Sequence, residues 1–195
     1  MKHKLRQQFE NYSPRSMDFS YSRAGVLVPV TDSGDPEIVL TLRASSMSTH
    51  SGQVAFPGGM REEQDKTLLD TALRETEEEI GLSRDKVEII SPLSDVVSLH
   101  RILVSPYAGV IPAHSECGPE LKELESVFRV PVSFFLEDRR VRTDSISFGS
   151  WKLHVPAWQW GNYQIWGLSA IVLVDFLNVG FDAGIDITRP DPKAG

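Results

Sequence analysis

The sequence is short of cysteine and of long apolar runs. Its single cysteine, Cys117, leaves no partner for an intrachain disulfide, so a small disulfide-built scaffold is excluded. No stretch approaches the roughly 20 apolar residues that a membrane-spanning helix needs. The charged start of the chain, with Lys2, Lys4 and Arg6, is not followed by the apolar segment of a secretory signal. We therefore expect a cytoplasmic protein with no membrane partner.

Positive charge is also scarce. The 20 Lys and Arg residues are outnumbered by 27 Asp and Glu residues, which gives a net charge of −7 and predicts no nucleic-acid partner. A small anionic ligand is still compatible, because a bound metal reverses the local charge.

A length of 195 residues predicts one domain with a sizeable core. We expect a lead-in over residues 1–20, a domain over 21–181 and a loose tail over 182–195; a homodimer is left open.

Hydrophobic patterning predicts mainly short strands and two principal helices. The helices are expected at about 67–80 and 168–179. Strands are expected at 24–30, 38–43, 54–56, 87–90, 94–98, 102–111 and 127–130, followed by a hairpin of 145–155 and 159–166 with Pro156 near its loop. This mixture predicts an α+β fold, an α/β/α sandwich around a mixed sheet.

The first of these helices carries the most informative residues. At about 100° per residue, Glu75, Glu78 and Glu79 fall on one stripe, beside a mostly apolar arc that can face a core. Three neighbouring carboxylates repel one another, and oxygen-only ligands suit Mg²⁺ or Mn²⁺. Thr67 with Asp70, or else Asp65, can cap the helix start, and Gly81 can end it. The alternative is a solvated face held by Glu–Arg pairs.

A glycine loop precedes this helix and strengthens the metal-site interpretation. Phe56-Pro57-Gly58-Gly59 follows a short apolar segment, and the glycines permit close backbone approach. Such a loop can present carbonyls to a metal or amides, such as that of Gly58, to a phosphate. Arg74 can orient a helix glutamate through a charge-assisted hydrogen bond.

The order of these residues resembles a known signature. The stretch from Arg74 to Leu82, read RETEEEIGL, is similar to the second half of the signature helix of the Nudix hydrolases, with Thr76 in place of an aliphatic residue. The first half of that signature usually has a glutamate at a fixed distance after Gly59, and this sequence lacks it. Asp65 is the nearest acid, and the stretch between it and Arg74 is one residue longer than usual. This longer form resembles the coenzyme A diphosphatase branch. Supporting segments are VLTLR (39–43), HSGQVAFPGG (50–59), ELESVFRVP (123–131) and IWGLSA (165–170).

The resemblance implies a Nudix fold and metal-dependent hydrolysis of a pyrophosphate bond in coenzyme A or its thioesters. The products would be adenosine 3′,5′-bisphosphate and 4′-phosphopantetheine. Glu75, Glu78 and Glu79 would hold Mg²⁺ or Mn²⁺, with the Gly59 carbonyl as a further ligand. Glu78 and Glu123 are the two candidate bases. Arg43 and His50 are candidate phosphate contacts, and Trp158, Trp160, Tyr163 and Trp166 are dense enough to line a pocket for a base, although such rings are more often core.

Two departures keep other functions open. Ala44 and Ser48 stand where the coenzyme A motif usually has serine and a second arginine. The loss of that arginine favours another small-molecule nucleotide substrate, such as ADP-ribose, a dinucleotide or a nucleoside triphosphate. A non-catalytic nucleotide-binding module is the third interpretation. The presence of all three helix glutamates argues against it.

Overall fold

The computed structural model describes residues 1–44, 52–120, 122–148 and 151–189. Its helices are α1 (Lys2–Phe9), α2 (Leu68–Ile80), α3 (Val132–Leu136) and α4 (Gly167–Phe181), with a 3₁₀ turn at Arg84–Lys86. Its strands are β1 (Ser22–Asp32), β2 (Glu37–Arg43), β3 (Val54–Ala55), β4 (Gly58–Met60), β5 (Glu88–Pro92), β6 (Val96–Val97), β7 (Ile102–Pro112), β8 (Leu124–Pro131), β9 (Arg140–Phe148), β10 (Trp151–Trp160) and β11 (Tyr163–Ile165). No helix among these residues is long and apolar enough to cross a membrane.

The centre of the molecule is a mixed sheet. Strands β1 and β7 run parallel over their full length, from Ser22 opposite Ile102 to Asp32 opposite Pro112. The other pairings in this sheet are antiparallel. A second sheet contains β11, β10 and β9 in that order. The predicted α+β class with a mixed sheet is confirmed.

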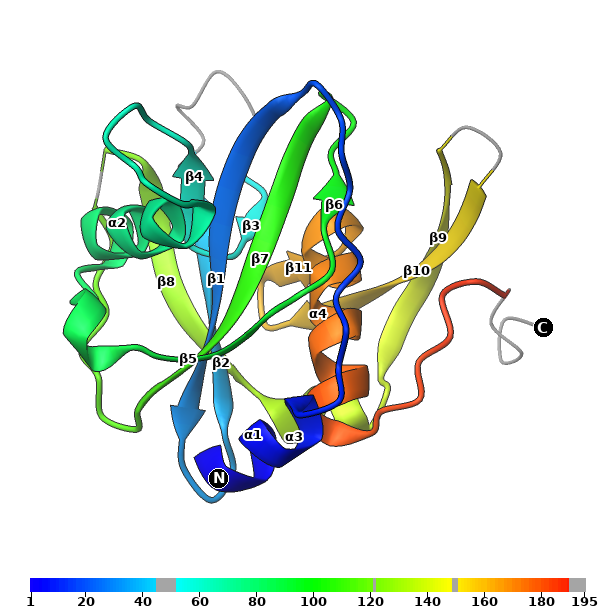
Figure 1. Ribbon diagram of the computed structural model, residues 1–195. Helices are drawn as coiled ribbons and strands as arrows, with labels where there is room; N and C mark the ends of the chain where they lie inside the picture. Colours follow the sequence, from blue (N-terminus) through cyan, green and yellow to red (C-terminus); the bar gives the residue numbers. More distant parts are fainter. Residues whose placement is uncertain (45–51, 121, 149–150, 190–195) are drawn as a thin grey trace.

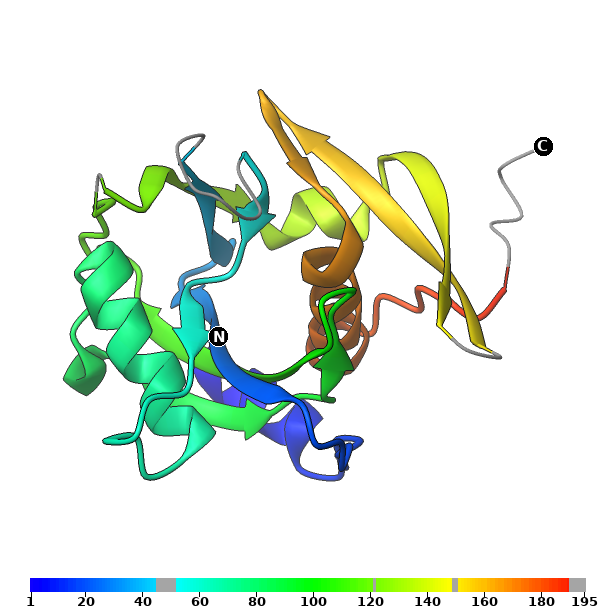
Figure 2. The same cartoon turned by 90° about the horizontal axis from the view of Figure 1, so that it is seen from above.

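Helices cover both faces of the mixed sheet (Figures 1 and 2). Alternation along β1 explains the two layers: Val26, Val28 and Val30 pack in the larger core cluster with α4, whereas Leu27 packs with Ile80 of α2 in a smaller one. Helix α1 lies against the C-terminal part of α4 and buries its own apolar residues there. The sheet therefore lies between α2 and α4, as the predicted sandwich requires.

The mixed sheet splits at the end that carries the glycine loop of β4. Strands β1 and β2 share the pair Val30 and Ile38, after which β1 pairs with β4 and β2 pairs with β3. The segment from Val54 to Met60 is thus inserted between β1 and β2. It has neighbours on both faces of the sheet, since the Ser169 hydroxyl of α4 donates to the Val54 carbonyl and the Gly58 amide donates to Glu79 of α2.

One expectation for the C-terminal third is wrong. Pro156 lies within β10, opposite Thr143 of β9, and not in a hairpin loop. A proline is tolerated there because the ladder shifts register at the next step, between Ala157 and Trp158. Within the described part of the tail, Ile185 is buried, and the Ile187 carbonyl accepts a hydrogen bond of 2.7 Å from the His154 amide.

Candidate active site

Helix α2 brings its glutamates to the split in the sheet. The sequence predicts both ends of this helix correctly: Thr67 and Asp70 form a reciprocal capping box, and Gly81 ends it with φ of 69°. Near its C-terminal end the helix borders a cavity of about 80 Å³. The cavity is lined by five glutamates, Glu75, Glu78, Glu79, Glu120 and Glu123. Every side chain in this lining therefore offers carboxylate oxygens.

The three helix glutamates lie in different environments. The Glu78 side chain is 59% exposed and that of Glu75 is 16% exposed, whereas Glu79 is buried. We expected all three to point beside the core, but the helix rotation turns Glu79 toward the sheet, on the side of Ala72 and Thr76. Burial raises the pKa of Glu79 to about 7, and burial also raises the pKa of Glu75.

Two groups stabilise the buried carboxylate of Glu79. The Gly58 amide donates to Glu79 Oε2 at 3.0 Å, and Arg43 Nη1 lies 3.9 Å from Glu79 Oε1. Gly58 was expected to direct its amide at a substrate phosphate, but in this structure that amide is committed to Glu79. Arg43 keeps donor capacity, because its buried Nε has no hydrogen-bond partner among the described residues. His50 and Ser48 lie outside the described residues.

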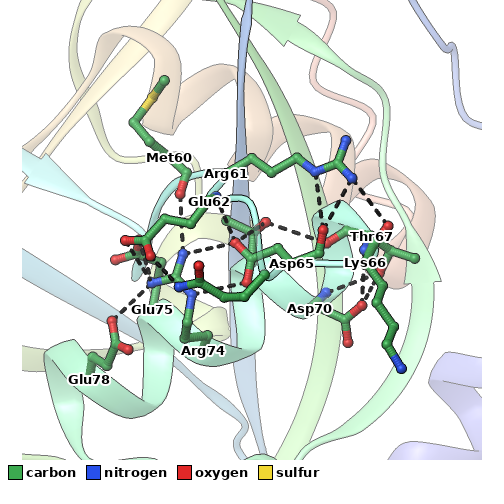
Figure 3. A network of polar contacts seen from close by, with 12 residues as sticks. Met60, Arg61, Glu62, Asp65, Lys66, Thr67, Asp70, Arg74, Glu75 and Glu78 are labelled. Atoms are coloured by element: carbon green, nitrogen blue, oxygen red, sulfur yellow. Dashed lines mark hydrogen bonds and ion pairs between the residues drawn. The ribbon is translucent and has the colours of Figure 1, made fainter.

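Arg74 is the hub of the polar network at the site (Figure 3). Its Nη1 donates to Glu75 Oε1 and to Glu78 Oε2, both at 3.0 Å. Its Nη2 donates to the Met60 carbonyl, at the end of the glycine strand, at 3.2 Å. One guanidinium thus orients two helix glutamates and ties the helix to β4, in agreement with the orienting contact that we expected.

Asp65 holds this guanidinium from the other side. It accepts Arg74 Nε on Oδ1 at 3.0 Å and Nη2 on Oδ2 at 2.9 Å, the bidentate geometry of a strong arginine–carboxylate pair. The hydroxyl of Thr71 and the amide of Glu62 also donate to Asp65, which is buried. The sequence indicated Asp65 only as a possible N-cap of the helix or as the acid nearest to the position of the expected glutamate.

We predict that Asp65→Asn lowers the free energy of unfolding by about 2 kcal/mol at pH 7, because it leaves Arg74 with a weaker, neutral partner. Urea unfolding monitored by circular dichroism measures this change. The control is Asp18→Asn, which alters an exposed carboxylate 3.7 Å from Arg23 and is expected to have an effect below about 0.5 kcal/mol. Equal stability of the Asp65 variant and the native protein would contradict this role.

The same pair predicts an acid-sensitive stability. The Arg74 guanidinium holds the pKa of Asp65 well below its usual value, which is about 3.9 in an unfolded chain. A lowered folded-state pKa stabilises the protein above the unfolded pKa, and this contribution disappears as the pH falls below about 4. Unfolding measured from pH 7 to pH 3 should therefore show a smaller loss of stability in Asp65→Asn than in the native chain. Parallel curves would contradict this linkage.

The glycines of β4 allow the helix to approach the strand. A Cβ on Gly59 would lie 2.4 Å from the carboxyl carbon of Glu75, and one on Gly58 would lie 2.4 Å from the Gly25 carbonyl oxygen. Gly58 also has φ of 148°, a conformation that L residues rarely adopt. The space that Glu75 occupies therefore exists because Gly59 has no side chain. The predicted role of the Gly59 carbonyl as a metal ligand is separate from this steric role.

The loop before β8 brings the remaining carboxylates. The Glu120 amide donates to the Glu79 carbonyl at 2.8 Å, and the Glu123 carbonyl accepts from the Ala44 amide at 2.9 Å. These bonds fix the loop to the end of α2 and to the end of β2. Glu123 was predicted for this site. Glu120 was not, because in the sequence it is one of several acids in a polar loop.

The carboxylate oxygens that line the cavity are of the type that binds a hard divalent cation, but they do not converge on one point in this structure. No three His, Cys, Asp or Glu side chains in the described ranges are close enough together to hold a metal ion. Arg74 draws Glu75 and Glu78 to one side, while Gly58 and Arg43 hold Glu79. Mg²⁺ or Mn²⁺ prefers ligands that are all oxygen atoms. Such an ion would also stabilise the ionised form of carboxylates that burial disfavours.

Cys117 is separate from this chemistry. It lines a wider groove of about 680 Å³ at the C-terminal end of α2, together with Gly81 and Arg129. Burial raises the pKa of its thiol, which disfavours the nucleophilic thiolate. This environment argues against a nucleophilic role for Cys117.

Comparison with known proteins identifies the family. The model of the NUDIX domain matches residues 21–133, more than half of the chain. The chain belongs to the Nudix family. Nudix hydrolase 15, mitochondrial, of Arabidopsis thaliana is 36% identical, over 94% of this chain and 68% of that protein. An uncharacterized Nudix hydrolase, NudL, of Photorhabdus laumondii is 31% identical over 82% of this chain and 86% of its own length.

A solved structure supports the fold. A MutT/nudix family protein from Enterococcus faecalis aligns with a TM-score of 0.56 at 14% identity, covering 91% of this chain and 68% of that one. The family match and the two relatives, and not this structure, show that the protein is a Nudix hydrolase and an enzyme. Nudix hydrolases generally use divalent metals.

Proposed function

We propose that this Nudix hydrolase cleaves the pyrophosphate bond of coenzyme A or its thioesters in a reaction that depends on Mg²⁺ or Mn²⁺. The products are adenosine 3′,5′-bisphosphate and 4′-phosphopantetheine or its acyl derivative. The observation that carries the chemistry is the cavity lined by five glutamates at the end of α2. Pyrophosphate hydrolysis needs such a site, since cations must offset the charge of the phosphates.

Each residue of the site has a role in this proposal. Glu75, Glu78 and Glu79 hold the metal, with the Gly59 carbonyl as a further ligand. The bound ion supplies charge neutralisation and acidifies the attacking water. Arg74 orients Glu75 and Glu78 through its two contacts of 3.0 Å, and Asp65 fixes Arg74 in turn. Gly59 lies beside Glu75, since a Cβ on Gly59 would be 2.4 Å from the carboxyl carbon of that residue.

Glu78 and Glu123 are the candidates for the base that accepts the proton of the water. Glu78 already accepts a charge-assisted hydrogen bond from Arg74, so one of its oxygens is committed. The Glu123 side chain has no hydrogen bond or ion pair to any other described residue, and it lines the same cavity. This difference favours Glu123 as the base and Glu78 as a ligand.

The substrate assignment rests on the segments on either side of the glycine loop. Arg43 ends β2 beside Glu79, and its buried, unpartnered Nε provides a donor for a phosphate oxygen. The segments 39–43, 50–59 and 165–170 resemble those of coenzyme A diphosphatases. Ser48, which replaces an arginine of that motif, favours the second candidate, another nucleoside diphosphate derivative such as ADP-ribose, NADH or a nucleoside triphosphate.

Chromatography of the products tests the substrate. The purified protein is incubated with coenzyme A and Mg²⁺ or Mn²⁺, with an EDTA control and a parallel panel of ADP-ribose, NADH and nucleoside triphosphates. We expect adenosine 3′,5′-bisphosphate and 4′-phosphopantetheine in the metal-containing samples alone, with coenzyme A cleaved at least ten times faster than the panel. Preferential cleavage of a panel member would refute the coenzyme A assignment and support the second candidate.

A further inference from the structure

Strand β9 forms an open edge of the second sheet. The strand order of this sheet is β11, β10, β9, so among the described strands β9 pairs with β10 alone. The β9–β10 hairpin extends from the molecule on the side away from α2 (Figures 1 and 2). Strand β11 pairs only with residues 158–160 of β10, at the base of the hairpin. Its outer part is thus a two-stranded ribbon, which is at best marginally stable in water without further packing.

The backbone of β9 directs hydrogen-bonding groups to this open edge. The His154 amide of β10 donates to the Ile187 carbonyl and not to β9, so His154 and Ser145 form a non-hydrogen-bonded pair of the ladder. The N–H and C=O groups of Ser145 therefore point to the outer edge, while those of the adjacent Asp144 point to β10. An edge with outward-facing donors and acceptors is a template for a further strand.

Exposed apolar side chains gather around the same strand. Six large apolar side chains in the described ranges are exposed, and three of them lie at or beside β9. Val141 is within β9 and is 58% exposed, and Leu136 ends α3, just before the strand. Trp166 is 40% exposed, and the guanidinium of Arg142 on β9 lies 5.9 Å from the centroid of its ring. Exposed apolar groups beside an open strand edge indicate an interaction surface.

The charges of β9 are complementary to a second copy of the same strand. Arg142 and Asp144 are two residues apart, and Arg142 Nε donates to both carboxylate oxygens at 2.9 and 3.1 Å. If two β9 strands pair antiparallel about a two-fold axis at Thr143, Arg142 of each copy lies directly opposite Asp144 of the other. Because the backbone of Asp144 points to β10, these are non-hydrogen-bonded pairs, in which opposed side chains are closest.

We propose that this protein forms a homodimer in which the β9 strands of two copies pair antiparallel, joining the two three-stranded sheets into one. The net charge of −7 makes two copies repel each other, so they associate where the facing charges are balanced. Charged residues usually protect an edge from other strands, and here they match one arrangement of one partner. The dimer is independent of the substrate, because β9 contributes no residue to the lining of the glutamate cavity.

Sedimentation of the full-length protein at concentrations up to about 200 μM tests the dimer. We expect twice the mass of one chain, with a Kd of about 10 μM, since an interface built on one strand is small. Arg142→Asp and Asp144→Arg each place like charges opposite one another, and each should weaken the dimer by about 100-fold. The control is Arg84→Asp, which reverses the charge of an exposed arginine 3.9 Å from Glu77 and should dimerise like the native protein.

An equimolar mixture of the two variants distinguishes an interface from an effect on folding. In a mixed dimer every charge at Arg142 and Asp144 lies opposite an unlike charge, so the mixture should dimerise although each variant alone is monomeric. A chain with both substitutions should dimerise for the same reason, and it decides the matter if a single variant fails to fold by circular dichroism. A native protein that is monomeric throughout, single variants that dimerise, or a mixture or double variant that stays monomeric would overturn the proposal.

Discussion

Glu79→Gln is expected to reduce kcat/KM for metal-dependent hydrolysis by on the order of 10³-fold while the protein stays folded. Glutamine has nearly the same size as glutamate, and its amide oxygen can still accept the Gly58 hydrogen bond of 3.0 Å. The variant lacks the charge that a metal would neutralise. Because an ionised group is costly to bury, removing this charge should leave the stability unchanged or higher. Initial rates and urea unfolding, measured together, separate the two effects.

Glu77→Gln is the matched control on the same helix. Glu77 is exposed, lies 3.9 Å from Arg84 and does not line the cavity. We expect its kcat/KM to stay within about twofold of the native value, since exposed ion pairs contribute little. A Glu79→Gln variant with native rates would exclude Glu79 from the metal site. Equal losses in the two variants would indicate a general effect of charge on this helix.

The sequence was most informative where the determinants are local. The capping box of Thr67 and Asp70, the apolar spacing of α2 and the left-handed Gly81 lie within a few residues of one another, so helix propensity and capping rules predict them. The near-continuous apolar run of β1 is likewise typical of a strand with both faces covered. The sequence also shows directly that the glycine loop precedes the acidic helix, and the site is built from these two segments.

Other features depend on contacts between distant segments, which a single sequence does not encode locally. The burial of Glu79 arises because α2 packs on β4, and the pair of Asp65 with Arg74 bridges a loop and a helix. Glu120 enters the site through a hydrogen bond to the end of α2. Pro156 was taken for a loop residue because proline lacks the donor of a strand ladder, yet an irregular register accommodates it.

Gly25→Ala is expected to be the most destabilising single-methyl change in the site region, with a loss of about 3 to 4 kcal/mol. A Cβ on Gly25 would lie 2.1 Å from the Leu68 carbonyl oxygen and 3.0 Å from the Ala72 amide nitrogen. Both are backbone atoms of α2, so no side-chain rotation relieves the overlap. Strand β1 is held by β7 and β4 on its two edges at this position, opposite Ser105 and Gly59. The helix must therefore move away from the sheet.

Movement of α2 couples this stability effect to activity. The same helix carries Arg74, Glu75 and Glu79, so a shift that relieves the overlap also displaces the site, and we expect hydrolysis to fall by at least tenfold in the fraction that folds. Gly34→Ala is the control, because nothing lies within 4 Å of its Cβ position, and its stability should change by less than about 1 kcal/mol. Urea midpoints of the three proteins measure the difference. A Gly25→Ala variant as stable as Gly34→Ala would mean that α2 does not pack this closely on β1, and the contact between Glu79 and Gly58 would then need another explanation.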